Sequence, residues 1–371
     1  MSEKSKTAAP RYLFIDALRG IAALLVVGYH AREGHHLTAL SKVLPRWLDA
    51  LLEHGDTGVA MFFTISGFVI ANTLIPQQVT PRYAGTFMLR RSLRLDPPYW
   101  ASMLLCVALA ALSAQVLHRP FDLPSAKIVL LHVLYLHELF HVQSIADVYW
   151  TLCLEIQFYL SFTLLMIAIT KLSPRLGKER ALDLLLWPAA AFANLWALQA
   201  APFQVYGLFL GQWFMFMAGV LVWRAVVRAE QGDLWPAAVA ALDLAVLGVG
   251  AAYFGDLSAG VGVLTAASVL ALGLSRRLTT TLSARPFQFL GAISYSLYLI
   301  HSPLTGAGFR LGFMLTGRSA ALEAFWLVLV LAGCIAGAWV FYRLIEKPSM
   351  SLAKRIGRSP TPAPIMERRP S

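Results

Sequence analysis

The chain has 371 residues, of which 58% are hydrophobic and only 14% charged, and its formal net charge is +11. Apolar stretches long enough to cross a bilayer recur along its whole length, which excludes a soluble globular protein and predicts a polytopic membrane protein. The positive charge does not indicate nucleic-acid binding, because the basic residues fall between the apolar stretches and not on one soluble face.

Apolar stretches follow one another from near the first residue, and no small-residue cleavage site follows the first, so we expect no cleavable signal peptide. There are eleven of them: 12–30, 57–76, 96–117, 126–141, 149–170, 181–199, 206–223, 236–254, 257–274, 287–305 and 322–342. The fourth is the shortest and holds five ionisable residues. A stretch that short and polar is more often re-entrant or interfacial than spanning.

The distribution of basic residues tests this interpretation. If 126–141 does not cross, ten spans remain, both termini are cytoplasmic, and most of the 31 Lys and Arg residues lie on the cytoplasmic side. We therefore predict an all-α polytopic bundle of about ten transmembrane helices plus one re-entrant or interfacial helix. The predicted organisation is an N-terminal cytoplasmic tail, 1–11, a membrane domain, 12–345, and a basic cytoplasmic tail, 346–371.

The first span carries Arg19 and His30 inside an apolar run. An α-helix turns every ~3.6 residues and rises ~1.5 Å per residue, so the 11 positions make about three turns and roughly 16 Å. The two side chains therefore lie on one face, one above the other. Ionisable groups at membrane depth usually face a bundle interior or a wet cavity, so the pair predicts two stations along a passage.

The second span begins beside Asp56 and holds Ser66 among small residues in mid-span. Small residues permit close helix packing. Ser66 could instead be a nucleophile, but no Gly-x-Ser-x-Gly elbow surrounds it, so packing is the favoured interpretation.

Before the third span, Arg91 and Arg94 are three residues apart, which places them on one side of a helix. Guanidinium groups bind phosphates at two points, which suits a nucleotide-bearing substrate arriving from the cytoplasm. The alternative is that both residues only anchor the helix at the membrane surface.

The fourth stretch contains His137-Glu138-x-x-His141, which matches the His-Glu-x-x-His pattern of zinc metalloproteases. On a helix the two histidines could bind zinc and the glutamate could act as base. The pattern is short and lacks an evident third ligand, so we predict no metal site.

The fifth stretch buries Glu155, and the tenth carries His301 near its outer end. The predicted topology brings these two residues, His30 and Asp56 to a similar depth near the outer leaflet. A His–Glu pair could serve as a general base. Alternatively, Glu155 makes a structural polar contact between helices.

Taken together, six motifs resemble, in order, those of the acyltransferase family 3 membrane proteins, the O-antigen and exopolysaccharide O-acetylase type. They are Asp16–Arg19 with His30, Phe62–Phe68, Arg91 and Arg94 followed by proline, Trp150–Leu152 with Glu155 and Tyr159, Ser294–His301, and Glu346–Pro348. The resemblance covers about Arg11 to Arg355.

The resemblance implies a multi-pass enzyme of the bacterial inner membrane that holds no permanently bound cofactor. The family takes an acyl group, usually acetyl, from cytoplasmic acyl-CoA and passes it to a hydroxyl of a polysaccharide, lipopolysaccharide or other envelope glycan or glycolipid on the outer side. It implies His30 as the catalytic residue, oriented in our hypothesis by Glu155. The expected donor-binding residues are Arg19, Arg91 and Arg94, and the expected supporting polar residues are Asp16, Asp56, Ser66, Tyr159 and His301.

Asp96 departs from the family pattern, which more often has an apolar residue before the proline, and it is expected to weaken phosphate attraction beside the arginines. No soluble hydrolase-like domain is expected after the last span, so the membrane domain or a partner must handle the acceptor. Two alternatives remain: a secondary transporter, although the paired halves of many transporters are not evident, and an intramembrane zinc protease built on His137 and His141.

Overall fold

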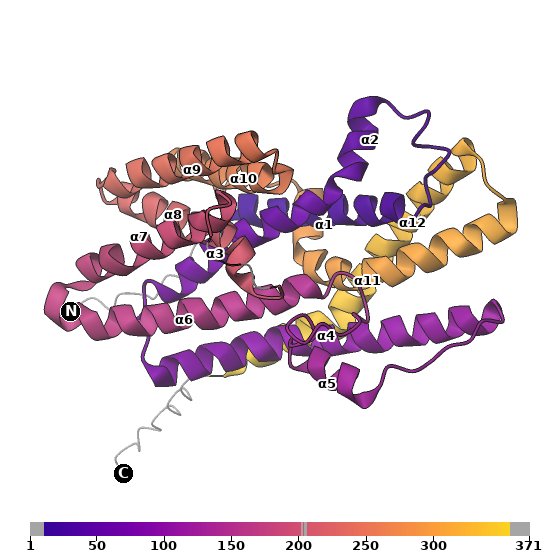
Figure 1. Cartoon of the computed structure of the whole chain (residues 1–371), viewed down its shortest axis with the longest axis horizontal. Helices are drawn as coiled ribbons and strands as arrows, with labels where there is room; N and C mark the ends of the chain where they lie inside the picture. The colour runs from indigo at the N-terminus through magenta and orange to yellow at the C-terminus, as the bar shows by residue number, and fades with distance from the viewer. Residues whose placement is uncertain (1–10, 202, 204–205, 357–371) are drawn as a thin grey trace, which may run out of the picture.

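The computed structural model describes residues 11–201, 203 and 206–356, and these contain helices and turns but no strand (Figure 1). The long helices are α1 (Leu13–Glu33), α3 (Gly58–Leu74), α4 (Pro81–Val116), α6 (Trp150–Leu176), α7 (Lys178–Ala197), α8 (Trp213–Glu230), α9 (Trp235–Phe254), α10 (Leu257–Leu274), α11 (Arg285–Thr316) and α12 (Ala320–Phe341). The short elements are α2 (Arg46–Glu53), η1 (Gly55–Thr57), α5 (Ala126–Val133), η2 (Phe209–Gln212), the π-helix η3 (Tyr342–Glu346) and α13 (Lys347–Arg355).

Eight helical segments in the described part of the chain are long and apolar enough to cross a membrane, and the predicted all-α polytopic fold is confirmed. The two other long helices, α7 and α11, are not among these eight. Their lengths of 20 and 32 residues are nevertheless sufficient to cross a bilayer. α7 packs between α6 and α8, and α11 packs against α1 and α12. Ten long helices therefore lie where ten spans were predicted, and crossing by α7 and α11 stays a prediction.

The stretch 126–141 contains one helix, α5, of eight residues. At ~1.5 Å per residue this helix is about 12 Å long, far short of a ~30 Å hydrocarbon core. The residues after Val133 form turns, and Figure 1 shows the segment lying beside α4 at the edge of the bundle. This supports the interpretation that the stretch does not cross.

Glycines let α1 approach both of its neighbours closely. A side chain at Gly20 of α1 would overlap α11, and one at Gly291 of α11 would overlap α1. A side chain at Gly58 of α3 would overlap the backbone of α1 at Ala22. Small residues at helix interfaces allow backbones to meet in this way. α1, which carries Arg19 and His30, is therefore held between α3 and α11.

The second span packs on α8 through a reciprocal pair of glycines. Gly67 of α3 lies against the backbone of Phe216, and Gly219 of α8 lies against the backbone of Thr64. Gly67 therefore allows the close helix packing that the sequence predicted for this segment. Its neighbour Ser66 does not face α8 and lines a cavity described below.

The chain continues after α12 without a break in helix, through η3 into α13, which packs on α4. The predicted boundary at 345/346 falls inside this helical segment, where Glu346 is buried. Most of the predicted N-terminal tail, 1–10, and residues 357–371 of the predicted C-terminal tail lie outside the described residues.

Candidate active site

Two cavities lie end to end inside the bundle and share part of their lining. The first, of about 300 Å³, is lined by Arg19, Arg91 and Arg94, and we call it the arginine cavity. The second, of about 320 Å³, is lined by His30, and we call it the histidine cavity. Val59, Phe63 and Tyr298 line both cavities and form the wall between them. Arg19 and His30, which were predicted to lie along one passage, therefore line two adjoining cavities.

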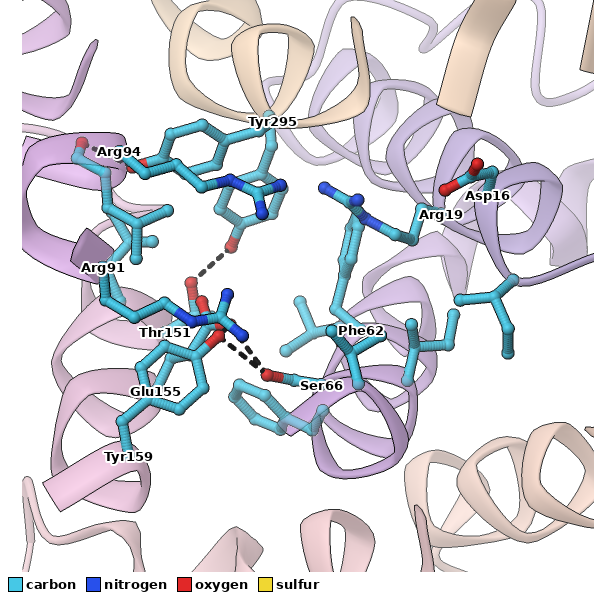
Figure 2. Close-up of a pocket in the computed structure, with 18 residues that line it drawn as sticks. Asp16, Arg19, Phe62, Ser66, Arg91, Arg94, Thr151, Glu155, Tyr159 and Tyr295 are labelled. Atoms are coloured by element: carbon cyan, nitrogen blue, oxygen red, sulfur yellow. Dashed lines mark hydrogen bonds between the residues drawn. The ribbon is translucent and has the colours of Figure 1, made fainter. Parts of the chain in front are cut away.

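Figure 2 shows the three guanidinium groups turned toward the same space, Arg19 from α1 and Arg91 and Arg94 from α4 on the opposite side. Within the described residues none of the three makes a hydrogen bond or an ion pair with a side chain or the backbone. The Arg91 guanidinium lies over the Tyr159 ring, 4.9 Å from its centroid, which fixes its direction by a cation–π contact. Arg19 and Arg91 repel Arg94, and the buried Glu346 attracts it. A bound anion would relieve the repulsion among the three guanidinium groups.

The sequence of α4 explains where these arginines sit. Arg91 and Arg94 are one turn apart on the same face. Pro97 and Pro98 follow inside the helix and have no N–H, so the carbonyls four residues before them lose their helical donors. Tyr295 of α11 donates a hydrogen bond to the Leu95 carbonyl at 3.0 Å and ties this weakened turn to the bundle.

Asp96 does not face the arginines, contrary to the expectation that it weakens phosphate attraction. Its carboxylate accepts a hydrogen bond from Tyr135 at 2.9 Å and another from Ser92 on its own helix. It does not line the arginine cavity. Asp96 instead joins α4 to the segment after α5.

Glu155, Ser66 and Tyr159 meet at one side of the arginine cavity. Ser66 Oγ donates to Glu155 Oε1 at 2.8 Å, Tyr159 donates to the same oxygen, and the Ser66 and Tyr159 hydroxyls are 3.0 Å apart. The carboxylate is therefore bound within this cluster. Glu155 does not line the histidine cavity, so the predicted His30–Glu155 pair is not among the contacts of the described residues.

Two other carboxylates lie near the arginines. Asp16 lines the arginine cavity but forms an ion pair with Arg11, with Nε and Oδ2 2.7 Å apart. Glu346 is buried, accepts a hydrogen bond from Ser296 Oγ at 2.6 Å, and lies close enough to Arg19 and Arg94 to attract both. In the sequence, Glu346 was noted only as part of a motif. It is more than 300 positions from Arg19 along the chain, so their proximity in the fold was not predicted.

The histidine cavity has the opposite charge. Glu33, Asp56 and Asp147 line it together with His30, and none of the Lys or Arg residues in the described ranges does. Within the described part of the chain none of these three carboxylates is paired with a cation or a hydrogen-bond donor. Asp56 was predicted at this depth, whereas Glu33 and Asp147 were not singled out, because single acidic residues at span ends are common.

His301 lies directly behind His30. Its side chain is fully buried, and the centroids of the two imidazoles are 5.1 Å apart. Of the four residues predicted to share one depth, His30, Asp56 and His301 are thus together, and Glu155 is in the other cavity.

The metalloprotease pattern does not form a helix. α5 ends at Val133, and residues 134–141 are turns. His137 is buried and stacks on His132 with centroids 3.9 Å apart, while His141 packs on Tyr206. Burial lowers the pKa of His137 to about 3, so its ring is neutral at physiological pH. The two histidines face different neighbours and not one metal position.

Comparisons with known proteins agree with these observations. The family model described as an acyltransferase domain, Acyl_transf_3, matches residues 12–343. A protein of Komagataeibacter xylinus, provisionally named membrane-bound transacylase BcsY, is 30% identical over 366 residues, which cover 92% of this chain and 83% of that protein. Nodulation protein 10 of Rhizobium leguminosarum bv. viciae is 27% identical over 366 residues, 91% of this chain and 93% of its own. No solved structure matches significantly.

Proposed function

Because the chain belongs to the acyltransferase family 3, we propose that this integral membrane acyltransferase moves an acyl group, in the simplest case acetyl, from cytoplasmic acyl-CoA to a hydroxyl of an envelope carbohydrate or glycolipid on the outer side. The observation that carries the proposal is the pair of adjoining cavities, one lined by three guanidinium groups that make no ion pair within the described residues and the other by His30. Such an arrangement suits an anionic donor on one side and an acceptor hydroxyl on the other.

The arginine cavity supports a phosphate-bearing donor. Guanidinium groups bind phosphate oxygens in pairs, and these bonds are strong because both partners are charged. A volume of about 300 Å³ is at the lower end of the range for small-molecule sites, so it accommodates part of an acyl-CoA and not all of it. In this proposal the phosphates lie against Arg91 and Arg94, the pantetheine arm passes Arg19, and the thioester reaches the shared wall beside His30.

Two routes satisfy the chemistry at His30. In the first, one imidazole nitrogen takes the proton of the acceptor hydroxyl, the hydroxyl oxygen attacks the thioester carbonyl, the C–S bond breaks, and the CoA thiolate receives the proton. In the second, the imidazole nitrogen attacks the thioester carbonyl, the C–S bond breaks and CoA leaves as the thiolate. The acceptor hydroxyl oxygen then takes the acyl group from the ring, and the hydroxyl proton goes to the thiolate. Acyl-enzyme that accumulates without acceptor supports the second route.

Sidedness provides the test of the proposal. Inside-out membrane vesicles that contain the protein expose its predicted cytoplasmic face, and they should transfer label from [14C]acetyl-CoA to their glycan or glycolipid fraction. Right-side-out vesicles given the same donor outside should remain unlabelled until they are permeabilised. Vesicles without the protein serve as the control. Equal labelling in both orientations, or none in either, would contradict the proposed donor or its side of entry.

The charge of the histidine cavity supports an uncharged acceptor. Glu33, Asp56 and Asp147 present acceptor oxygens to sugar hydroxyls, whereas an anionic group would be repelled. We expect methyl glucoside, as a soluble probe, to be acetylated at least tenfold faster than the matching methyl glucuronide.

Changing Asp56 and Asp147 together to Asn should reduce this preference and leave the KM for acetyl-CoA unchanged, as measured by transfer at several salt concentrations. An unchanged or reversed ratio of the two rates would show that these carboxylates do not select the acceptor. Glu53→Gln, at an exposed carboxylate that lies outside both cavities, is the matched control.

A further inference from the structure

The buried ring behind His30 has an orientation that its hydrogen bonds define. His301 Nδ1 lies 2.8 Å from the carbonyl oxygen of Tyr298 and 3.1 Å from that of Leu297. Carbonyl oxygens only accept hydrogen bonds, so Nδ1 must carry the proton. In the neutral ring, Nε2 then holds a lone pair and no proton.

That lone pair has no partner among residues 11–201, 203 and 206–356. His301 Nε2 is buried, and within the described residues nothing donates a hydrogen bond to it. The neighbouring hydroxyl of Tyr298 is already engaged with Thr151 and with the carbonyl of Val148. A buried acceptor without a donor is uncommon and costly, which makes such an atom a functional candidate.

His30 is placed to supply the missing donor. The 5.1 Å between the two ring centroids is close to the separation of two imidazoles joined by one N–H···N hydrogen bond of ~2.9 Å. The side chain of His30 lines the histidine cavity and makes no hydrogen bond within the described residues. A small rotation of this ring would join it to His301.

We propose that His301 is a positioning residue that accepts a hydrogen bond from one N–H of His30 and thereby fixes its tautomer. The inference rests on the proposed function of His30. With one ring nitrogen committed to His301, the other keeps its lone pair and faces the histidine cavity. That nitrogen is the atom that takes the acceptor proton or attacks the thioester, so the orientation serves either route.

The position also explains why His301 acts through His30 and not on substrate. His301 lines neither cavity, and its side chain has no exposed surface. The other groups that face His30 are Tyr29 and the carboxylates Glu33, Asp56 and Asp147. All four line the histidine cavity with His30, whereas the buried His301 does not.

The test compares two substitutions of His301 in the intact protein in vesicles. Leucine fills the site without a polar atom, whereas glutamine keeps a terminal oxygen that can accept and an amide that can donate to the Tyr298 carbonyl. We expect His301→Leu to lower kcat by about 100-fold, within the range for loss of a correctly placed base, with the KM for acetyl-CoA within twofold of wild type. His301→Gln should recover kcat to within tenfold of wild type.

Thr305→Val, one turn further along α11 at another buried polar position, is the matched control and should keep full activity. If the leucine variant does not insert or fold, the glutamine variant decides alone: a kcat more than 100-fold below wild type in a folded His301→Gln would overturn the inference. So would full activity in a folded His301→Leu. An inactive wild type with acetyl-CoA would instead contradict the proposed function, and the two failures are therefore distinguishable.

Discussion

Replacing His30 by alanine should abolish acyl transfer, with a loss of at least ~10²–10⁴-fold in kcat, the range that a general base contributes. His30 lines the histidine cavity, and in the second of the proposed routes it is also the nucleophile. Insertion and stability should be unchanged, because its side chain is only partly buried and alanine is a better helix former than histidine. The measurement is the initial rate of transfer from [14C]acetyl-CoA in vesicles, with protein amount and thermal unfolding checked in parallel.

The matched control is His54→Ala, at an exposed histidine near the end of α2 that lines neither cavity. It should retain wild-type activity. A His30→Ala variant that transfers acyl groups at near the wild-type rate would remove His30 from the centre of the mechanism, and the role assigned to His301 would lose its basis.

Arg94→Lys should impair the reaction almost as much as Arg94→Ala, mainly by raising the KM for acyl-CoA. A hydrogen bond to a charged group contributes about 1.5–3 kcal/mol, which corresponds to roughly a tenfold to hundredfold change. Lysine keeps the charge and would satisfy a simple membrane anchor, but it cannot reproduce the planar fork that holds a phosphate at two points. Rates measured across acyl-CoA concentrations separate a KM effect from a kcat effect.

Arg82→Lys is the matched control, since Arg82 is exposed at the start of the same helix and lies outside both cavities. This variant should bind the donor normally. If Arg94→Lys kept full activity, Arg94 would only anchor its helix at the membrane surface. The donor phosphates would then have to bind elsewhere.

Hydropathy predicted the positions of the long helices well but not all of their ends. The first stretch, 12–30, and α1 nearly coincide, because the lipid-facing and buried residues of that helix are almost uniformly apolar. The third stretch was placed from residue 96, whereas α4 begins at Pro81. The arginines and Asp96 lower the local hydropathy, and helix propensity with packing against α13 extends the helix beyond the apolar part.

The site was predictable where its members lie on one helix. The spacing of Arg91 and Arg94, and that of Arg19 and His30, determines which side chains share a face, and the structure places both pairs accordingly. Partners on different helices depend on the rotation of each helix about its axis, which hydropathy does not specify. For that reason Glu155 was assigned to His30 although it binds Ser66 and Tyr159, and the contact between His30 and His301 was not foreseen.

The wall between the cavities has a consequence for the energetics of the cell. A protein with wet, charged compartments on both sides of a bilayer would conduct protons or ions if water joined them, and the membrane potential would be lost. Val59, Phe63 and the ring of Tyr298 interpose apolar surface, and the only hydroxyl among them is bonded to Thr151 and Val148. A narrow apolar constriction resists wetting and blocks such conduction. An acyl chain on a flexible arm can pass where a hydrated ion cannot, so we propose that the wall between the proposed donor and acceptor sites also keeps the enzyme from conducting ions.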